Sequence, residues 1–539
     1  MSTFSTLLKQ RIRRDRVTVT IWVASAAFLA LVGAIGVARE YDTAAAREGI
    51  MRLAVANPTI LLLRGLPSGA HLDQFVFFEI FTYLALMAAL MSTFLAVRHS
   101  RAEEESGRAE LVASTPAARL IPTTATVAHG VLANLALGLV VALAFIGAKL
   151  DPAGSLLTGA AAAGTGIAFL GLGLLAAQFF RSPRAANSIS VAAVLLAFVL
   201  RGIGDALGTP AKDGLHMTSA WPSWLSPIGW AQHVDAYGSN TPVPLLLLLA
   251  LAAVAIGGVY LLQSHRDSGA SLVAERAGRA DASATLAGTL ALAWRLQLPS
   301  IIGWAIGGAA CGLFAGSLSS LVRSAAVSSS AINDTLSSMA GGGASLDQAL
   351  VTIMFSIAGV LAAASAIQAV IRMRQEESGG TAELLLASPV SRVRWFRDYL
   401  VVGGVAIAAV LLAGALVGAG AVLASGSSTE LIPTVFGAAA AQLPAALVFL
   451  GVLALVFTLF PAMTAGLGWA VLGVTFFIGV FGPLLGLPEN VVKLSPFANT
   501  PVSYGDDVDW SGGIWMVAIA AVAIAASLLL MRRRALQST

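Results

Sequence analysis

Charged residues are scarce in this chain. Asp, Glu, Lys and Arg make up 11% of its 539 residues, whereas 57% are hydrophobic. A soluble domain carries roughly 25% charged residues, so the composition excludes an ordinary soluble protein and indicates an integral membrane protein. Cys311 is the only cysteine, which excludes an intramolecular disulfide and a cysteine-based metal cluster. The net charge of +4 is modest, and nothing in its distribution indicates nucleic-acid binding.

The chain also lacks the residues of a nucleotide site. A Walker A loop requires a glycine directly before its lysine, because the glycines cradle the phosphates that the lysine contacts. None of the four lysines (Lys9, Lys149, Lys212 and Lys493) follows a glycine, so the sequence contains no P-loop. No HExxH, GxSxG or Cys/His zinc pattern occurs either. We therefore expect no catalytic residues, no metal site and no cofactor in this chain.

Long apolar runs are what the sequence contains instead. A helix needs about 20 apolar residues to cross a bilayer, and the short alternating strands of an outer-membrane barrel are missing. The sequence therefore predicts an all-α polytopic membrane protein with twelve transmembrane helices. These lie near 18–38, 74–97, 123–147, 155–179, 187–206, 243–263, 300–322, 350–371, 399–424, 431–459, 464–486 and 512–531.

The twelve runs divide into two homologous six-helix bundles. We predict a first half at 1–263, a cytoplasmic linker with an interfacial helix at 264–298, and a second half at 299–539. Residues 4–16 combine helically spaced apolar residues with five basic ones, which indicates an interfacial helix at the start of the first half too. A disordered basic tail is the alternative there.

The distribution of Lys and Arg predicts the orientation. Most of them fall on one side of the membrane if both termini are cytoplasmic, as the positive-inside rule requires. The preference for Arg over Lys and the abundance of Ala suggest a GC-rich bacterial genome. We therefore expect a multi-pass protein of a bacterial cytoplasmic membrane, in contact with membrane lipid.

One charged loop motif occurs in both halves, about half the chain length apart. The first copy comprises Glu104, Glu105, Ser106, Gly107, Glu110, Thr115, Pro116 and Arg119. The second comprises Glu376, Glu377, Ser378, Gly379, Glu383, Ser388, Pro389 and Arg392. The Ser-Gly pairs should break a helix, and a short helix with Glu110 or Glu383 should follow. Thr115-Pro116 and Ser388-Pro389 have the chemistry of an N-cap followed by a proline at the first helical position. An ordinary solvated connector is the alternative reading of each loop.

The repeated pattern Glu-Glu-Ser-Gly-x-Ala-Glu-Leu resembles the first cytoplasmic loop of type-2 ABC-exporter permeases. The stretches 224–232, 266–270 and 292–297 are similar to duplicated twelve-span permeases that export polyketide antibiotics, the tetronasin-resistance type. The resemblance covers essentially the whole chain. It implies that each loop carries a coupling helix that docks on one of two copies of a separate P-loop ABC ATPase subunit, which holds ATP and magnesium. The second copy departs from the first by one inserted residue.

An aromatic cluster surrounds a single acid in the second apolar run. Glu79 lies among Phe75, Phe77, Phe78, Phe81 and Tyr83, and Phe355 lies in the corresponding run of the second half. A charged group inside a membrane is a functional candidate by default. The resemblance implies a substrate pathway between the second and fifth spans, which would include these residues and Arg201. Alternatively, Glu79 reaches water or pairs with Arg201, and Arg201 forms an ion pair with Asp205.

We therefore predict the permease subunit of an ATP-driven exporter of a hydrophobic small molecule, such as an antibiotic or drug. An ion-coupled twelve-span secondary transporter is the first alternative, with Glu79, His129 and Arg201 as proton relays. His129 alone is more typical of a hydrogen-bonded packing residue. A membrane scaffold or sensor without transport activity is the second alternative.

Overall fold

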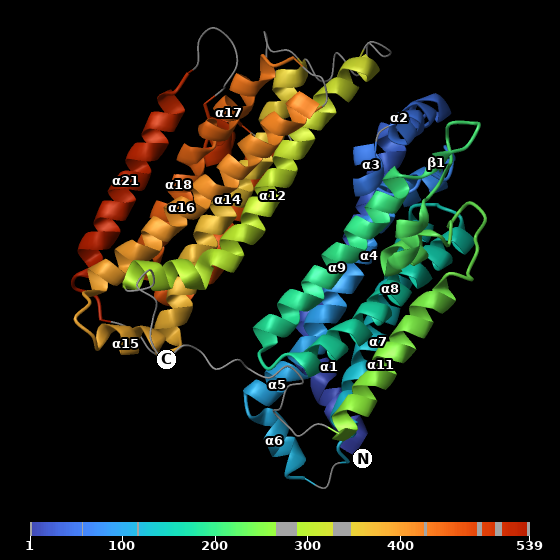
Figure 1. The fold of residues 1–539 in the computed structure, drawn as a ribbon, viewed down its shortest axis with the longest axis horizontal. Coiled ribbons are helices and arrows are strands. Elements are labelled where there is room, and N and C mark those ends of the chain that lie inside the picture. The colour runs from blue at the N-terminus through green and yellow to red at the C-terminus, as the bar shows by residue number, and fades with distance from the viewer. Residues whose placement is uncertain are drawn as a thin grey trace. The chain divides into compact units, whose positions relative to one another are not determined.

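The computed structural model describes residues 3–56, 58–115, 118–265, 288–326, 346–424, 428–481, 488–501 and 509–535. These residues include twelve helices that are long and apolar enough to cross a membrane, which confirms the predicted all-α polytopic fold. The chain divides into two compact units, 1–277 and 278–539, each built around its own buried helices (Figure 1).

In the first unit, α4 and α8 are the most deeply buried spans, and the other long helices pack around them. A two-stranded antiparallel hairpin, with Thr209 opposite Thr218, follows α9. The elements are α1 (Thr3–Glu40), α2 (Ala44–Ala56), α3 (Pro58–Leu63), α4 (Leu72–Arg98), α5 (Arg101–Glu105), α6 (Arg108–Ala113), α7 (Ile121–Gly147), α8 (Pro152–Phe179), α9 (Pro183–Ala206), β1 (Thr209–Pro210), β2 (Met217–Thr218), η1 (Trp221–Leu225), α10 (Pro227–Gln232) and α11 (Leu245–His265).

In the second unit, α14 is surrounded by α12, α16, α17, α18 and α19. The span expected at 431–459 is interrupted at Gln442, two residues before Pro444, and therefore consists of two helices. The elements are α12 (Thr289–Ala326), α14 (Leu346–Ser378), α15 (Thr381–Leu386), α16 (Arg392–Ala424), α17 (Leu431–Ala441), α18 (Leu443–Leu459), η3 (Pro461–Met463), α19 (Thr464–Phe481), α20 (Glu489–Val492), η4 (Pro496–Asn499) and α21 (Ser511–Met531).

Glycines allow close approach of helices in both units. A side chain at Gly159 in α8 would collide with the backbone carbonyl of Gly138 in α7. A side chain at Gly312 in α12 would meet the carbonyl of Gly414 in α16 in the same way. The small residues of the spans therefore serve helix packing, as is common for membrane helices.

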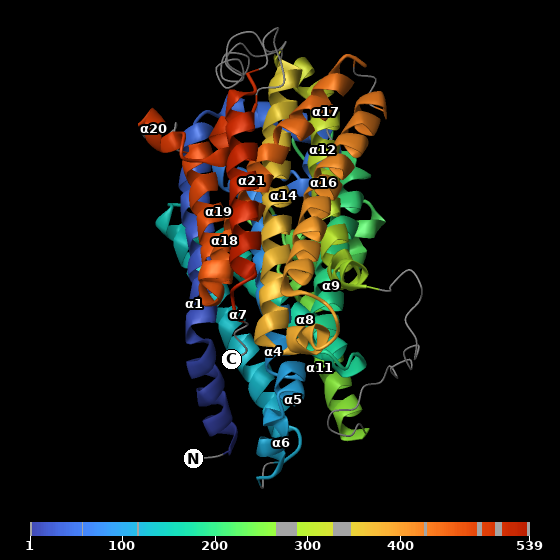
Figure 2. The same ribbon diagram turned by 90° about the vertical axis from the view of Figure 1, so that its left-hand side faces the viewer.

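We expected a separate interfacial helix before the first span of each unit, but in the described residues each unit begins with one long helix. Helix α1 runs without a break from Thr3 to Glu40, and its first turns lie on the same side as α5 and α6 (Figure 2). Arg11 and Asp15, one turn apart, are buried against the rest of the unit, so these turns belong to its packed structure. Helix α12 is likewise one assigned helix from Thr289, with Pro299 inside it.

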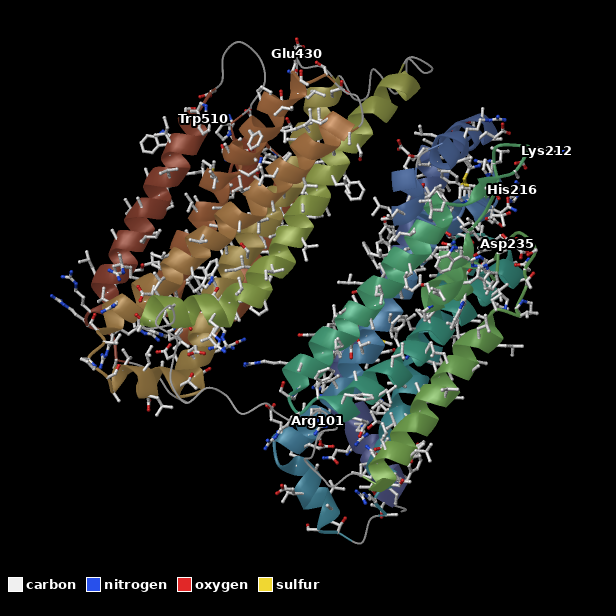
Figure 3. All side chains as sticks on the ribbon, in the orientation of Figure 1. Arg101, Lys212, His216, Asp235, Glu430 and Trp510 are labelled. Carbon is white, nitrogen blue, oxygen red and sulfur yellow. The ribbon has the colours of Figure 1, made fainter. Side chains whose placement is uncertain are left out.

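Charged and polar side chains gather at the two ends of the first unit. Arg101 lies at one end, and Lys212, His216 and Asp235 lie at the opposite end (Figure 3). In the first unit, the repeated loop motif therefore lies at the end marked by Arg101.

Candidate functional sites

Each unit has one loop element, which we define as residues 101–119 in the first unit and 376–392 in the second. In the first, α5 ends at Glu105, Gly107 has a φ of +73°, and the six-residue helix α6 follows. In the second, α14 ends at Ser378, Gly380 has a φ of +74°, and the six-residue helix α15 follows. The predicted break and short helix are therefore present in both. The inserted residue makes Gly380, one position after Gly379, the left-handed residue, a conformation that glycine adopts without strain.

The two short helices expose an equivalent pair of side chains. Glu110 and Glu383 are exposed, and the leucines beside them, Leu111 and Leu384, are 71% and 78% exposed. The leucines were not among the expected site residues, although the repeated Ala-Glu-Leu sequence contained them. Each loop element thus offers an apolar side chain next to a carboxylate on a short rigid helix.

The hydroxyl groups of Thr115 and Ser388 have a different role from the one expected. Thr115 Oγ1 donates to the Val112 carbonyl and Ser388 Oγ to the Leu385 carbonyl, both at 2.6 Å. They close the short helices and do not begin the following ones, so the predicted N-cap role is wrong. The following helices begin later, α7 at Ile121 and α16 at Arg392.

Each copy of the loop motif contains one proline. Pro389 is exposed between α15 and α16, and Pro116 lies outside the described residues. Ser391 caps α16, because its Oγ accepts from the Arg394 amide at 3.2 Å.

The arginine that ends each copy of the motif contacts the last span of its own unit. Arg119 Nη1 donates to the carbonyl of Ser264 at 3.4 Å, at the end of α11. Arg392 Nη1 donates to the carbonyl of Arg534 at 2.6 Å, just after α21. Cations interact favourably with the carbonyl end of a helix. These two arginines therefore connect each loop element to the last helix of its bundle.

The first loop element is held by a buried arginine. Arg101 is 2% exposed, and its Nε and Nη2 donate to the Ala177 carbonyl in the last turn of α8, at 3.0 and 2.7 Å. Its Nη1 donates to Glu104 at 2.5 Å, and Glu103 forms an ion pair with Arg14 of α1. Of the three consecutive acids, only Glu105 is exposed.

The second loop element is held by a buried acid. Glu377 is 1% exposed, and both of its carboxylate oxygens accept from Arg534 Nη2, at 2.6 and 2.9 Å. Arg374 donates to the same carboxylate at 3.2 Å, and the Arg534 guanidinium lies over the Phe457 ring. Glu376 is paired with Arg372. Glu377 therefore faces the interior of its unit, whereas Glu105, its equivalent in the motif, faces outward.

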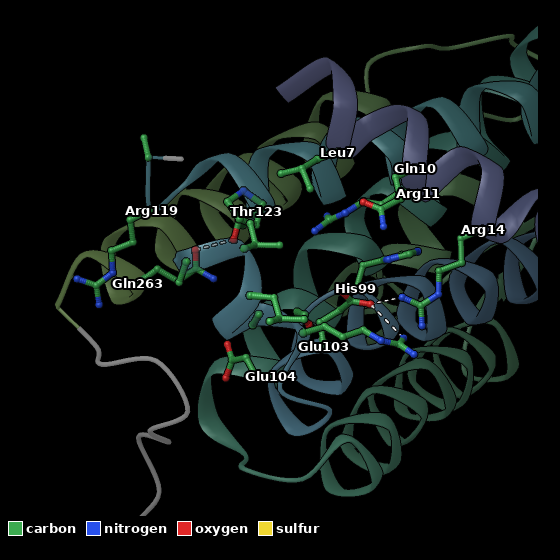
Figure 4. A pocket seen from close by; sticks show the side chains of 18 residues that line it. Leu7, Gln10, Arg11, Arg14, His99, Glu103, Glu104, Arg119, Thr123 and Gln263 are labelled. Carbon is green, nitrogen blue, oxygen red and sulfur yellow. Dashed lines mark hydrogen bonds and ion pairs between the residues drawn. The ribbon is translucent and has the colours of Figure 1, made fainter. Parts of the chain in front are cut away.

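A cavity of about 610 Å³ adjoins the first loop element (Figure 4). It lies between the first turns of α1, the loop element, the start of α7 and the end of α11. Its wall is mixed in charge, with Arg11, Arg14 and Arg119 on one hand and Glu103 and Glu104 on the other. None of the predicted pathway residues lines it.

The aromatic residues of α4 contribute to the packing of the first unit. Phe75 and Phe78 contact the cluster that contains Met51 of α2, and Phe77 and Phe81 stack with ring centroids 4.6 Å apart. These four are at most 3% exposed, whereas Tyr83 is 41% exposed.

Two aromatic residues of the predicted pathway, Phe355 and Phe77, lie in different surroundings. Phe355 is fully buried in the core of the second unit. Phe77 also lines a cavity of about 210 Å³ near the hairpin, together with His233 and Asp235. Packing accounts for the buried rings, and a substrate role for them stays a prediction.

The charged residues of the predicted pathway pair locally. Glu79 forms an ion pair with Arg64, which follows α3, and not with Arg201. Arg201 and Asp205 are fully buried and paired at 3.1 Å, as the four-residue spacing indicates. Arg201 also donates to the carbonyls of Leu61 and Leu62 at 3.2 and 2.5 Å. These contacts fasten α3 to α4 and α9.

The structure also brings together three residues that no sequence spacing connects. Asp15 of α1 lies between His99, directly after α4, and His129 of α7. All three are buried. Sequence reasoning singled out His129 alone, because the three residues are distant along the chain and meet only in the folded unit.

Comparison with known proteins places this architecture in a family. The family model described as "Multidrug efflux system permease Rv1217c, C-terminal domain" matches residues 11–261 and 286–532, one stretch in each half. The chain is 34% identical over 531 residues to the multidrug efflux system permease protein Rv1217c of Mycobacterium tuberculosis (strain ATCC 25618 / H37Rv). This match covers 98% of the chain and 94% of the relative. The chain belongs to the Rv1217c family of efflux permeases.

Membership in the Rv1217c family agrees with the twelve apolar helices. It confirms the prediction of a transmembrane permease of the multidrug-efflux type and of a multi-pass membrane protein.

Proposed function

We propose that this chain is the permease subunit of an ABC exporter whose separate ATPase subunits dock on the two loop elements. The observation that carries the proposal is the equivalent display of Glu110-Leu111 and Glu383-Leu384 on short helices after a left-handed glycine. The chain contains no P-loop of its own, so ATP and magnesium would be bound by the partner. Two equivalent surfaces call for two ATPase copies.

The exposed leucines supply the apolar centre of each docking surface. Burying one fully exposed leucine is worth about 1.5–3 kcal/mol, whereas an exposed carboxylate mainly selects a basic counterpart at the rim. The loop elements can pass on a movement because they are attached to the bundles. Arg119 and Arg392 connect them to α11 and to the end of α21, and Arg101 and Glu377 hold their bases.

The cargo we propose is a hydrophobic small molecule such as an antibiotic, which leaves the inner leaflet or cytoplasm. The name of the M. tuberculosis relative, a multidrug efflux permease, supports this class. The Lys and Arg distribution supports loop elements and both termini in the cytoplasm of a bacterial cell. The resemblance to polyketide-antibiotic exporters supports the same cargo class.

The ion-coupled alternative gains no support from the described contacts. Its three expected relay residues pair with different partners: Glu79 with Arg64, Arg201 with Asp205, and His129 with Asp15. The three pairs are separate, and the described contacts connect none of the three residues directly to another.

The test is the double variant Leu111→Asp, Leu384→Asp. The permease would be purified from its own membranes and probed for a co-purifying P-loop ATPase, and export would be measured in parallel. We expect ATPase association and export to be lost, because a buried unpaired carboxylate is strongly unfavourable at an interface.

The matched control is Leu494→Asp, an equally exposed leucine (73%) that follows α20 and is part of neither loop element. It should retain both ATPase association and export. Export by the double variant at the level of the control would overturn the docking proposal.

A further inference from the structure

The contacts of Asp15 form a convergent set of ligand atoms. One ligand atom from each of Asp15, His99 and His129 lies within 4.8 Å of the other two. His129 Nε2 is 3.2 Å from Asp15 Oδ2, and His99 Nε2 is closer still. Both imidazole rings direct Nε2 at the same carboxylate oxygen of Asp15, and the two rings are nearly perpendicular, at 83°.

We infer that Asp15, His99 and His129 bind one divalent metal ion of the zinc type. In a tetrahedral site with bonds of about 2.0–2.1 Å, ligand atoms lie roughly 3.3 Å apart, which is close to the spacing observed between Asp15 and His129. Two imidazoles and a carboxylate suit zinc, whereas calcium and magnesium prefer oxygen ligands alone. Three protein ligands leave a fourth position for water.

The surroundings of the three residues support the ligand roles. Arg98 Nε lies 3.2 Å from Asp15 Oδ1, so it orients the carboxylate through the oxygen that the ion would not use. The three side chains are at most 5% exposed, which shields the site from bulk water. Arg98 and the nearby Arg11, which contacts Thr126, repel a cation. We therefore expect weaker binding than at a structural zinc site with thiolate ligands.

The position of the site gives the ion a definite structural effect. His99 lies at the break between α4 and α5, where Ser100 has a φ of −126° and a ψ of −89°. In the second unit α14 runs unbroken to Ser378, and residues 371 and 402, the equivalents of His99 and His129, are Ile and Val. The ion would thus fasten the first turns of α1 to the base of the first loop element only.

The experiment uses the full chain with a purification tag free of histidine, reconstituted in phospholipid nanodiscs and stripped with a chelator. Zinc binding is measured by competition with a fluorescent zinc indicator. Cobalt is added to a second sample, since its visible absorption distinguishes four-coordinate from six-coordinate sites. We expect one equivalent of zinc and a four-coordinate cobalt spectrum from the unmodified chain.

The variants His99→Ala, His129→Ala and Asp15→Asn should each lower zinc affinity about tenfold or more. The matched control is His216→Ala, which removes a histidine that is paired with Asp213 in the hairpin. It should bind zinc as the unmodified chain does.

Lack of a saturable zinc equivalent in the unmodified chain would overturn the inference, and so would equal binding by the double variant His99→Ala, His129→Ala. The cobalt spectrum decides the matter if a variant does not fold. The loop-element proposal is independent of the ion, since a docking surface at Leu111 and Leu384 needs no metal.

Discussion

The two loop elements share what they expose and differ in what holds them. Both turn at one left-handed glycine and both present a glutamate beside a largely exposed leucine. The first is held by Arg101 on the carbonyl end of α8, and the second by Glu377 between Arg374 and Arg534. One unit therefore uses a buried cation where the other uses a buried anion.

The exposed Glu-Leu pairs are equivalent in the two units, whereas the buried groups that hold the loop elements, their supports, differ. One kind of partner bound to both units would contact only the exposed pairs, so only these would have to be equivalent. The supports are internal, and each can be satisfied by any set of groups that pairs the buried charge. Changes in the supports should therefore affect one unit at a time.

The largest effect is expected for Glu377→Ala. It leaves Arg534 and Arg374 without their shared carboxylate, and removal of one partner of a buried pair costs about 3 kcal/mol or more. Cys311, the single cysteine, is buried in α12 of the same unit. Thermal unfolding followed with a thiol-reactive dye should thus show a clear fall in midpoint.

The control for this change is Glu105→Ala, the exposed equivalent in the motif. Its unfolding midpoint should match that of the unmodified chain. Equal midpoints for both alanine variants would mean that the two acids are not differently placed.

A somewhat smaller effect is expected for Arg101→Ala. It leaves the Ala177 carbonyl and Glu104 without their buried donor, which costs about 2 kcal/mol. Hydrogen exchange should accelerate in α5, α6 and the last turn of α8, with the second unit unaffected. Arg108→Ala removes an exposed arginine 4.0 Å from Glu103 and serves as the control, with little change expected. Faster exchange in the second unit would contradict separate supports.

Arg119→Ala and Arg392→Ala should have small effects of about 1 kcal/mol or less, because each removes an exposed contact to a helix end. The contact of Arg392 is shorter, at 2.6 against 3.4 Å, so its loss should matter more. Hydrogen exchange of the last turns of α11 and α21 measures both. Equal acceleration at both helix ends in either single variant would argue against this assignment.

The smallest effect is expected in the hairpin of the first unit, where the stability of the turn at Asp213 should depend on pH. The amide of Leu215 and the ring of His216 hydrogen-bond to Asp213 and hold the pKa of this carboxyl below its usual value. Because the pKa of Asp213 is lowered in the folded state, its carboxylate stabilises the hairpin at pH values above the ordinary pKa of 3.8. This stabilisation is lost as the pH falls through the folded-state pKa.

Exchange protection of the Leu215 and His216 amides should therefore decrease below about pH 4, whereas the loop elements should not respond to Asp213. Asp213→Asn removes the titration and is the control. Unchanged protection of these two amides in the unmodified chain would show that the carboxylate does not hold the turn.

The fold could be predicted from the sequence because bilayer thickness translates directly into long apolar runs. All twelve spans were predicted from such runs. The Ser-Gly pair in each motif predicted the break before the short helix, although the left-handed residue of the second copy is Gly380. The hydrogen-bond partners of the Thr115 and Ser388 hydroxyl groups could not be predicted from the sequence. Each hydroxyl can donate to a preceding carbonyl or accept from a following amide. The continuity of α1 and the burial of Arg11 and Asp15 were not predicted either.

The contacts of the candidate site residues could not be predicted from the sequence either. Glu105 and Glu377 have the same motif around them, yet their burial differs because Arg534 reaches Glu377 from 157 positions away. The Asp15, His99 and His129 cluster spans separations of 84 and 114 residues. Such pairings are decided by tertiary packing, which leaves no local signal in the sequence.

The most direct test of the central claim is native mass spectrometry of the permease, gently purified from its own host membranes. We predict a complex of one 55.0 kDa chain with two copies of a P-loop ATPase. A chain that carries export activity in undisturbed membranes and yet consistently runs without any ATPase would contradict it.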